Sequence, residues 1–117
     1  MSQRPSGESP DLEVLIDGHV GHIVLARPAR KNSFTIDMLR PWAEALRAFQ
    51  VDDQVRVVVL RARGDAFCAG VDLGDLDKLD RAPLSTRRLM TDQIHQIARA
   101  VEDLTKPLIA VVQGPAV

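Results

Sequence analysis

The sequence predicts an α/β fold with parallel neighbouring strands, because strand patterns alternate with helix patterns along the chain. Residues 55–60 (VRVVVL) and 108–112 (LIAVV) are short apolar runs rich in β-branched side chains, as buried strands require. Ahead of each run, apolar residues recur every three or four positions, which indicates an amphipathic helix. The predicted order is β-β-α-β-loop-α-β. Each apolar strand needs a covering layer on both faces, and two helices can cover little more than one.

The start of the chain predicts a flexible leader followed by a hairpin. Residues 1–10 (MSQRPSGESP) are rich in Ser, Pro and Gly, and residues 11–117 form the single predicted domain. Two short strands are expected between Val14 and Leu25, with Asp17-Gly18 as the turn that joins them. Arg27-Pro28 ends the second strand, because proline has no N–H for the ladder.

Two helices are expected after the hairpin. Thr35 is the predicted N-cap of the first helix, and Pro41 falls in its first turns, the part of a helix that tolerates a missing N–H. Gly64-Asp65 breaks the strand pattern of residues 55–60, and Lys106-Pro107 ends the second helix. The apolar positions are Leu39, Trp42, Ala43, Leu46 and Phe49 in the first helix, and Met90, Ile94, Ile97, Val101 and Leu104 in the second.

Composition and charge exclude several classes of partner. Fifteen basic and sixteen acidic residues give a formal net charge of −1, which offers no basic excess for nucleic acid. The chain has no run of 18 apolar residues and no signal peptide, so no membrane partner is expected. A single cysteine, Cys68, cannot form an internal disulfide, and a cytoplasmic location is therefore expected. The local cluster of Arg27, Arg30 and Lys31 can still meet a small anion.

The most informative stretch is residues 65–73 (DAFCAGVDL), directly after a predicted buried strand. Small residues such as Ala69 and Gly70 let the backbone approach a ligand, and Gly70 also permits a positive φ. If a short helix starts near Asp72, the N–H of Val71 is left unpaired and can receive an oxyanion. A tight strand-to-helix connection without a ligand is the alternative, and the residue types alone favour it.

Four segments in sequence order resemble the enoyl-CoA hydratase/isomerase (crotonase) superfamily. Residues 65–73 resemble its first oxyanion segment, F-C/S-A-G-A-D-L, and residues 22–34 (HIVLARPARKNSF) resemble its strand and turn, L-N-R-P-x-x-x-N-A-L/F. Residues 55–61 match the strand that comes next in the family's sequence pattern. Residues 106–117 (KPLIAVVQGPAV) are similar to the entry into the second oxyanion segment, K-P-x-I-A-x-V-x-G. The resemblance covers residues 12–117.

This resemblance implies a spiral of ββα turns, of which the chain is the truncated, amino-terminal part. It also implies a coenzyme A thioester as substrate, with no separate cofactor and no metal. Val71, next to Gly70, matches the first backbone N–H donor to the thioester oxygen. Full-length members commonly form trimers or pairs of trimers, which implies a homo-oligomer. The residues that match coenzyme A contacts are Ala29, Arg30, Lys31, Ala69, Val71, Asp72 and Leu73.

The implied activity is that of a lyase or isomerase of fatty acid metabolism. In the family, the second oxyanion donor is a glycine two residues beyond Val117, and the catalytic carboxylate follows it. We therefore expect no hydratase turnover from this chain alone. A non-catalytic truncated product or a coenzyme A-binding fragment is the alternative. The acyl chain, and the choice among hydration, double-bond migration, hydrolysis and dehalogenation, depend on residues beyond Val117.

Other reactive residue types have ordinary structural interpretations. Cys68 is expected to be a buried structural thiol. The three histidines lack the spacing of metal ligands. Four acidic residues lack calcium-loop spacing and predict solvated charges around one packed helix face. Those acidic residues are Asp72, Asp75, Asp77 and Asp80, and the predicted packed face is Leu73, Leu76 and Leu79.

Overall fold

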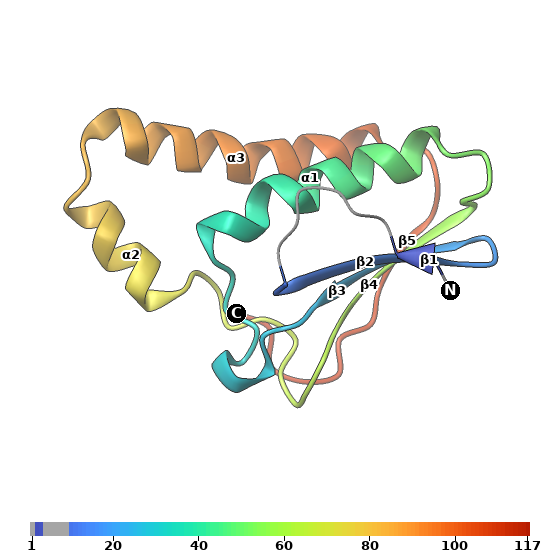
Figure 1. Ribbon diagram of the computed structural model, residues 1–117, viewed down its shortest axis with the longest axis horizontal. Helices are drawn as coiled ribbons and strands as arrows, with labels where there is room; N and C mark the ends of the chain where they lie inside the picture. The colour runs from blue at the N-terminus through green and yellow to red at the C-terminus, as the bar shows by residue number, and fades with distance from the viewer. Residues whose placement is uncertain (1, 4–9) are drawn as a thin grey trace.

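The computed structural model describes residues 2–3 and 10–117, which form one mixed sheet with helices on one side (Figure 1). The strands are β1 (Ser2–Gln3), β2 (Leu12–Asp17), β3 (Val20–Leu25), β4 (Val57–Ala62) and β5 (Leu108–Ala110), and they lie in that order across the sheet. Strands β1, β2 and β3 pair antiparallel, whereas β3, β4 and β5 pair parallel. The predicted α/β fold with parallel neighbours is confirmed.

The predicted leader falls only partly on described residues. Ser2 and Gln3 pair with Ile16 and Leu15 of β2. Residues 1 and 4–9 lie outside the described residues, so the flexible leader stays a prediction.

The hairpin of β2 and β3 turns one residue later than predicted. Asp17 pairs with Val20, so the two loop residues are Gly18 and His19 instead of Asp17 and Gly18. Gly18 has a φ of +60°, as the first loop position of a type II′ turn requires. The register of the ladder therefore follows the position of the glycine.

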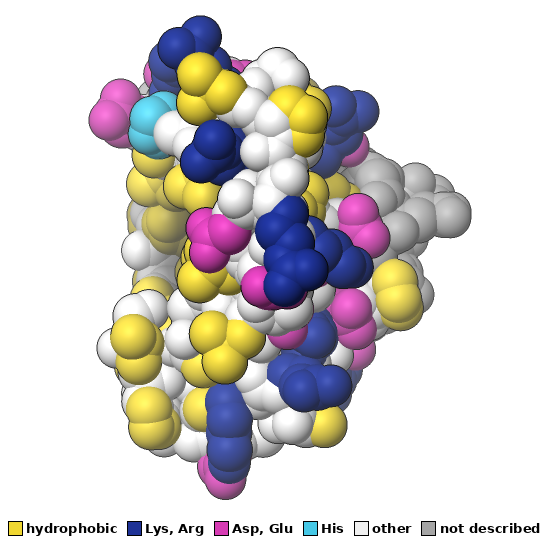
Figure 2. All heavy atoms as spheres, turned by 90° about the vertical axis from the view of Figure 1, so that its left-hand side faces the viewer, with side chains coloured by type: hydrophobic (Ala, Val, Ile, Leu, Met, Phe, Trp, Pro, Cys, Tyr) yellow, Lys and Arg dark blue, Asp and Glu magenta, His cyan; other side chains and the backbone are white. Residues whose placement is uncertain are grey.

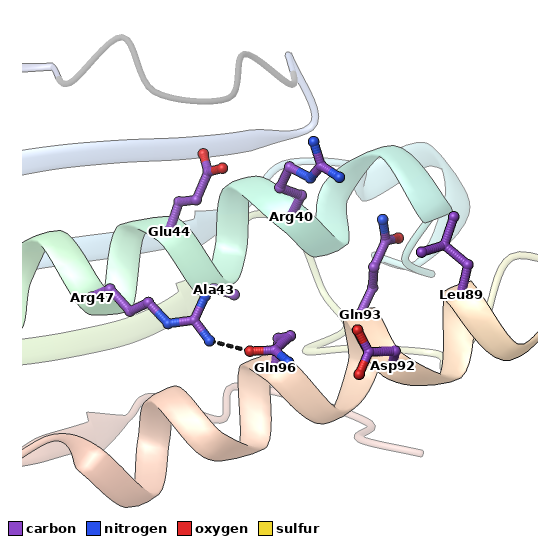
Figure 3. A pocket seen from close by; sticks show the side chains of 8 residues that line it. All are labelled: Arg40, Ala43, Glu44, Arg47, Leu89, Asp92, Gln93 and Gln96. Carbon is purple, nitrogen blue, oxygen red and sulfur yellow. Dashed lines mark hydrogen bonds between the residues drawn. The ribbon is translucent and has the colours of Figure 1, made fainter.

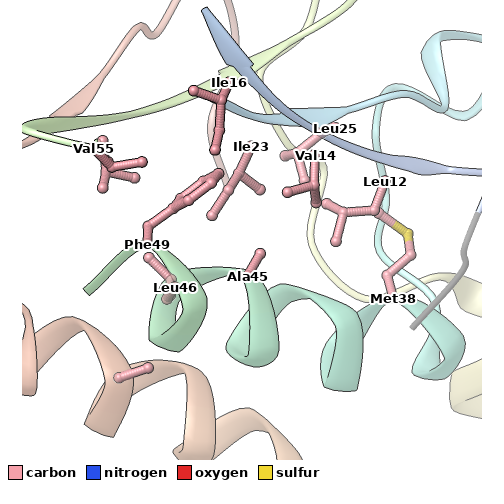
Figure 4. Packing of buried hydrophobic residues seen from close by; sticks show 12 residues of the cluster. Leu12, Val14, Ile16, Ile23, Leu25, Met38, Ala45, Leu46, Phe49 and Val55 are labelled. Atoms are coloured by element: carbon pink, nitrogen blue, oxygen red, sulfur yellow. The ribbon is translucent and has the colours of Figure 1, made fainter. Parts of the chain in front are cut away.

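Helix α1 (Ile36–Val51) covers one face of the sheet, and Thr35 is its N-cap as predicted. Pro41 lies in the second turn. The Phe49 ring lies directly under Gly21 of β3, where an added Cβ would come within 2.8 Å of the ring. Glycine thus lets the helix approach the strand closely. Figure 4 shows α1 side chains meeting those of the strands; the cluster comprises Leu12, Val14, Ile16, Ile23, Leu25, Met38, Ala45, Leu46, Phe49, Val55, Val58 and Ala100.

The other two α-helices of the described residues are α2 (Leu73–Asp80) and α3 (Leu84–Asp103). Figure 1 shows α3 lying along α1, so that α1 is sandwiched between α3 and the sheet. The opposite face of the sheet carries no helix among the described residues, and Ile109 of β5 is 51% exposed. The two long helices thus cover one face only, as the sequence indicated.

Two strands differ in extent from their predicted ranges. Strand β4 begins two residues after the start of the predicted run 55–60, since the Val55 N–H donates to the Asp52 carbonyl in the turn before the strand. Strand β5 stops at Ala110, two residues before the end of the run 108–112. Of the second helix's predicted apolar face, Met90 is buried whereas Val101 is exposed. None of the helices described here has the length and apolar character needed to cross a membrane.

Candidate functional site

A cavity of about 470 Å³ lies between the turn that follows β3 and the loop that leads into α2. Six of the seven predicted coenzyme A contacts line it, and the seventh, Ala29, is exposed in the 3-10 turn η1 (Pro28–Arg30). Gly70 lies between two lining residues. The cavity wall consists of Arg27, Arg30, Lys31, Ser33, Ala69, Val71, Asp72, Leu73 and Gly74. The sequence did not single out Ser33 and Gly74 as contacts, and it indicated Arg27 only through the basic cluster.

The backbone on both sides of Val71 is clamped by Phe34. The Phe34 N–H donates to the Gly70 carbonyl at 2.8 Å, and the Asp72 N–H donates to the Phe34 carbonyl at 2.9 Å. The Gly70–Val71 peptide is trans, so the Val71 N–H points opposite to the Gly70 carbonyl and away from Phe34. Within residues 2–3 and 10–117, no acceptor bonds this N–H. The clamp therefore fixes one backbone donor and leaves it unused.

Gly70 supports this arrangement through its backbone conformation. Its φ is +93°, in the left-handed region that side chains disfavour, and this matches the expectation from the sequence. An added Cβ would find only the Val117 carbonyl oxygen, at 4.0 Å. The position thus needs glycine for its φ and not for lack of space.

The side chain of Val71 anchors the same loop. It packs, together with Phe34, against a small buried cluster between the helices, formed by Leu39, Leu79 and Met90. Val71 thus lines the cavity while its isopropyl group packs against residues of α1, α2 and α3.

The C-terminal segment runs beside this loop. Cys68 and Ala116 form a parallel bridge, in which the Val117 N–H donates to the Cys68 carbonyl at 2.8 Å. The Phe67 N–H donates to the Pro115 carbonyl at 2.9 Å. Figure 1 shows the C-terminus ending next to the loop before α2. The two segments that resemble oxyanion loops therefore lie side by side.

Asp72 and Asp75 are held by hydrogen bonds, so the prediction of solvated charges is wrong for both. Asp72 is the N-cap of α2 and accepts the Asp75 N–H at 3.1 Å. That N–H, and then the Arg27 guanidinium, keep the pKa of the Asp72 carboxyl below its usual value. Asp75 in turn accepts the N–H of Ile36, the first residue of α1, at 2.8 Å. The two carboxylates connect helix ends that are distant in the sequence.

The predicted packed face of α2 is also largely wrong. Leu79 is buried, but Leu73 is 80% exposed and Leu76 is 43% exposed. Leu73 instead lines the cavity. Figure 2 views this end of the molecule and shows hydrophobic, basic and acidic side chains intermixed on its surface. With about 3.6 residues per turn, leucines spaced three apart point in successively different directions around the helix.

Asn32 joins the turn after β3 to the loop after β4. It is fully buried and has a φ of +57°. Its side-chain oxygen accepts the Arg27 N–H at 2.8 Å, and its amide nitrogen donates to the carbonyls of Arg63 and Ala66, both at 2.7 Å. The sequence analysis included this residue only as part of the strand-and-turn motif, residues 22–34. Its role depends on partners that the fold brings together.

Lys31 lines the cavity and forms an ion pair with Asp65, which is not among the lining residues. Its ammonium is 3.0 Å from the Asp65 carboxylate, and both side chains are exposed. The hydrogen bond and charge of Lys31 lower the pKa of the Asp65 carboxyl. A ligand anion that binds Lys31 therefore competes with the Asp65 carboxylate.

A second cavity, of about 190 Å³, lies between α1 and α3 (Figure 3). Its wall carries charges of both signs, including Arg40, Glu44 and Asp92, and Arg47 donates a hydrogen bond to Gln96 across it. None of the predicted site residues lies here. The described residues also contain no group of three His, Cys, Asp or Glu side chains placed to bind a metal ion.

Comparison with known proteins identifies the family. The family described as enoyl-CoA hydratase/isomerase matches residues 16–117. The chain belongs to the enoyl-CoA hydratase/isomerase family. The predicted membership is confirmed, and a solved structure extends it to the fold. An enoyl-CoA hydratase/isomerase from Mycobacterium paratuberculosis superimposes with a TM-score of 0.85 at 30% identity, covering 92% of this chain and 43% of that one.

Two curated relatives represent different reactions within the family. An enoyl-CoA hydratase of Alternaria alternata is 36% identical over 99 residues, covering 81% of this chain and 31% of the relative. A 1,2-epoxyphenylacetyl-CoA isomerase of Escherichia coli is 36% identical over 99 residues, covering 80% of this chain and 36% of the relative. The chain thus spans about a third of the length of these enoyl-CoA hydratase/isomerase family members.

Proposed function

We propose that the protein binds an acyl-coenzyme A thioester and that the Val71 N–H donates to the thioester oxygen as negative charge develops there. The observation that carries this proposal is an unused backbone donor, fixed by Phe34 on both sides, at the wall of a cavity. A donor aimed at developing charge stabilises the transition state by about 3–4 kcal/mol in a well-studied protease. Val71 needs no reorganisation to supply it.

The rest of the cavity suits the remainder of such a ligand. Arg30 and Lys31 place two cations at one rim, where they bind coenzyme A phosphates in this proposal. Ala69 and Leu73 offer small and apolar surface along the path between the phosphates and the thioester. Ala29, exposed in the adjacent turn, lies within reach of the nucleotide end. The ligand supplies the reacting group, and the proposal needs no additional cofactor.

A second donor fits the same geometry. Cys68 pairs with Ala116 and the Val117 N–H donates to the Cys68 carbonyl, so the position two residues beyond Val117 follows a segment that lies beside the loop of Val71. The family resemblance assigns the second oxyanion N–H to that position. The proposal for the whole protein is therefore an oxyanion hole with one N–H from each segment. A homo-oligomer and a cytoplasmic location belong to this whole-protein proposal, supported by the family resemblance and the single cysteine.

Binding without turnover is the second candidate for the chain as given. Asp72 is the one carboxylate among the described residues that line the cavity, and both its oxygens are engaged by Arg27 and by the Asp75 N–H. A carboxylate whose charged form is stabilised in this way is a poor general base, because its pKa is lowered. Hydration of crotonyl-CoA by the purified chain above the uncatalysed rate would exclude this second candidate.

Replacing Val71 by proline removes the donor and tests the proposed function. We expect the wild-type chain to bind acetyl-CoA roughly fivefold more tightly than S-ethyl-CoA, a thioether without the carbonyl, because one hydrogen bond is the difference. Val71→Pro should bind both ligands equally, since proline has no N–H and the bonds to Phe34 do not involve this nitrogen. Isothermal titration calorimetry measures both affinities.

The matched control is Val71→Ala, which keeps the N–H and shortens only the side chain. It should retain the preference for acetyl-CoA. An equal preference in Val71→Pro and Val71→Ala would contradict the assignment of the donor.

Replacing Asp65 by asparagine should strengthen coenzyme A binding. The variant frees Lys31 from its ion pair, so a phosphate no longer competes with a carboxylate. We expect an affinity gain of about two- to fivefold at low salt, because exposed ion pairs are weak. The gain should be smaller in roughly 0.5 M salt, because salt screens the interaction between Lys31 and the phosphate. Titration with coenzyme A at both salt concentrations measures the effect.

Asp77→Asn provides the control for net charge. Asp77 pairs with Arg81 at 3.7 Å and does not line the cavity. An equal gain in Asp77→Asn would assign the effect to overall charge and not to Lys31.

A further inference from the structure

Arg27 is the cavity residue with the most extensive set of side-chain contacts. Its side chain is only 14% exposed. One guanidinium nitrogen donates to the Ser33 carbonyl at 2.6 Å and to the Ser33 hydroxyl at 3.2 Å. The guanidinium also contacts one oxygen of Asp72 at 3.3 and 3.4 Å, and Asp11 lies 3.8 Å away. Arg27 thus has its charge and donors directed at protein groups.

These contacts join the two segments that fix the Val71 donor. Ser33 directly precedes Phe34, and Asp72 directly follows Val71. Phe34 forms a parallel bridge with Val71, in which its two hydrogen bonds hold the backbone of Gly70 and Asp72. Arg27 therefore connects the segment that contains Phe34 with the segment that contains Val71. It does so from a site that is largely shielded from water.

The backbone of Arg27 is itself immobilised. Its N–H donates to the Asn32 side chain at 2.8 Å, and its carbonyl accepts the N–H groups of Arg30 and Asn32 at 3.0 and 2.9 Å. Because the guanidinium is planar and rigid and the Arg27 backbone is fixed, the side chain can keep Ser33 and Asp72 at a constant distance from each other. Movement of Asp72 relative to Ser33 is restricted by this side chain.

We infer that Arg27 is a positioning residue that orients the Val71 N–H through Ser33 and Asp72, and that it is not a phosphate ligand. The inference rests on the proposed function of Val71. It divides the cations of the cavity by role: Arg27 sets the direction of the donor, whereas Arg30, which is exposed, binds the anionic end of the ligand. Loss of Arg27 should then affect recognition of the thioester carbonyl, and loss of Arg30 should affect every coenzyme A ligand alike.

The test compares affinities for acetyl-CoA and S-ethyl-CoA in the full chain. Arg27→Met, of similar length without charge, should reduce the roughly fivefold preference for acetyl-CoA to about one, as expected for loss of one hydrogen bond. Its affinity for S-ethyl-CoA should change by less than about twofold. Arg27→Lys should restore part of the preference, because lysine keeps the charge but not the fork. Arg30→Met should weaken both ligands equally and keep the ratio.

The Val71 amide gives an independent readout by ¹⁵N–¹H NMR. Acetyl-CoA should shift its proton downfield in the wild type and in Arg30→Met, but not in Arg27→Met. If Arg27→Met does not fold, Asp72→Asn decides the question. Asparagine still caps α2 but breaks the ion pair, and the preference should again fall.

Two results would overturn the positioning role while leaving Val71 in place. One is an unchanged preference in Arg27→Met or Asp72→Asn; the other is an equal loss of both affinities in Arg27→Met, which would make Arg27 a phosphate ligand. Failure of the proposed function is seen separately, in the wild type, as equal affinity for the two ligands and an unshifted Val71 amide.

Discussion

Asn32→Ala is expected to lower the free energy of unfolding by about 3 kcal/mol, because the buried groups that bond the Asn32 side chain lose their hydrogen-bond partner. The Arg27 N–H and the Arg63 carbonyl both lose a short bond to this side chain. The Ala66 carbonyl keeps a bond from Gln113 at 3.1 Å, so its loss is partly compensated. Thermal or urea unfolding followed by circular dichroism measures the change, which corresponds to a fall in Tm of more than roughly 10 °C for a domain of this size.

Two further variants separate the hydrogen bonds from the backbone conformation at position 32. Asn32→Gly accommodates the φ of +57° without strain, so a loss similar to that of alanine assigns the effect to the side-chain bonds. Lys31→Ala lies at the adjacent position with a φ of +52° and an exposed side chain, and it should change the stability by less than about 0.5 kcal/mol. An Asn32→Ala chain as stable as the wild type would show that other contacts hold the two loops together.

Gly114→Ala is expected to separate the C-terminal segment from the loop that carries Val71. A Cβ at this position would come within 2.1 Å of the Asp65 carbonyl oxygen and 3.3 Å of the Ala66 Cα. Both are backbone atoms, so no flexible side chain can move aside. The Phe67 and Val117 N–H groups then lose their bonds to the facing segment, at a cost of about 2–4 kcal/mol including the strain of overpacking.

Hydrogen exchange of individual amides is the measurement for this variant. The amides of Phe67 and Val117 should lose protection in Gly114→Ala, whereas those of β3 should keep it. Gly74→Ala is the matched control, because its added Cβ would meet only the flexible Asp72 carboxylate, at 3.2 Å. Retained protection of Val117 in Gly114→Ala would show that the two segments can pack with a side chain between them.

The sequence predicted the order of the elements well and their burial less well. The two helices, the parallel strands and the positive φ of Gly70 all follow from local patterns. The failed expectations concern contacts between distant segments. Asp75 caps α1 from 39 residues away, and Arg27 reaches Asp72 across 45 residues. Hydrophobic and charge patterns report the period of an element but not which neighbour it meets.

The same limit applies at the candidate site. Residue types in the loop before α2 favoured a simple connection, and only the resemblance of four ordered segments indicated an oxyanion loop. The cavity then brought six predicted contacts together with Arg27, Ser33 and Gly74. A cavity is a property of surfaces from several segments, so local sequence could not define its wall.

The sequence by itself determined that this chain builds an α/β unit with a glycine-containing loop between β4 and α2, because strand and helix periodicity and glycine's access to positive φ are local properties. Only the tertiary structure decided where the Val71 N–H points. In a trans peptide the C=O and the N–H point in opposite directions. Which of the two bonds to another part of the protein depends on the segment that packs beside it. Here Phe34 takes the Gly70 carbonyl, and that one contact turns the Val71 N–H away from Phe34 and leaves it without an acceptor among the residues described.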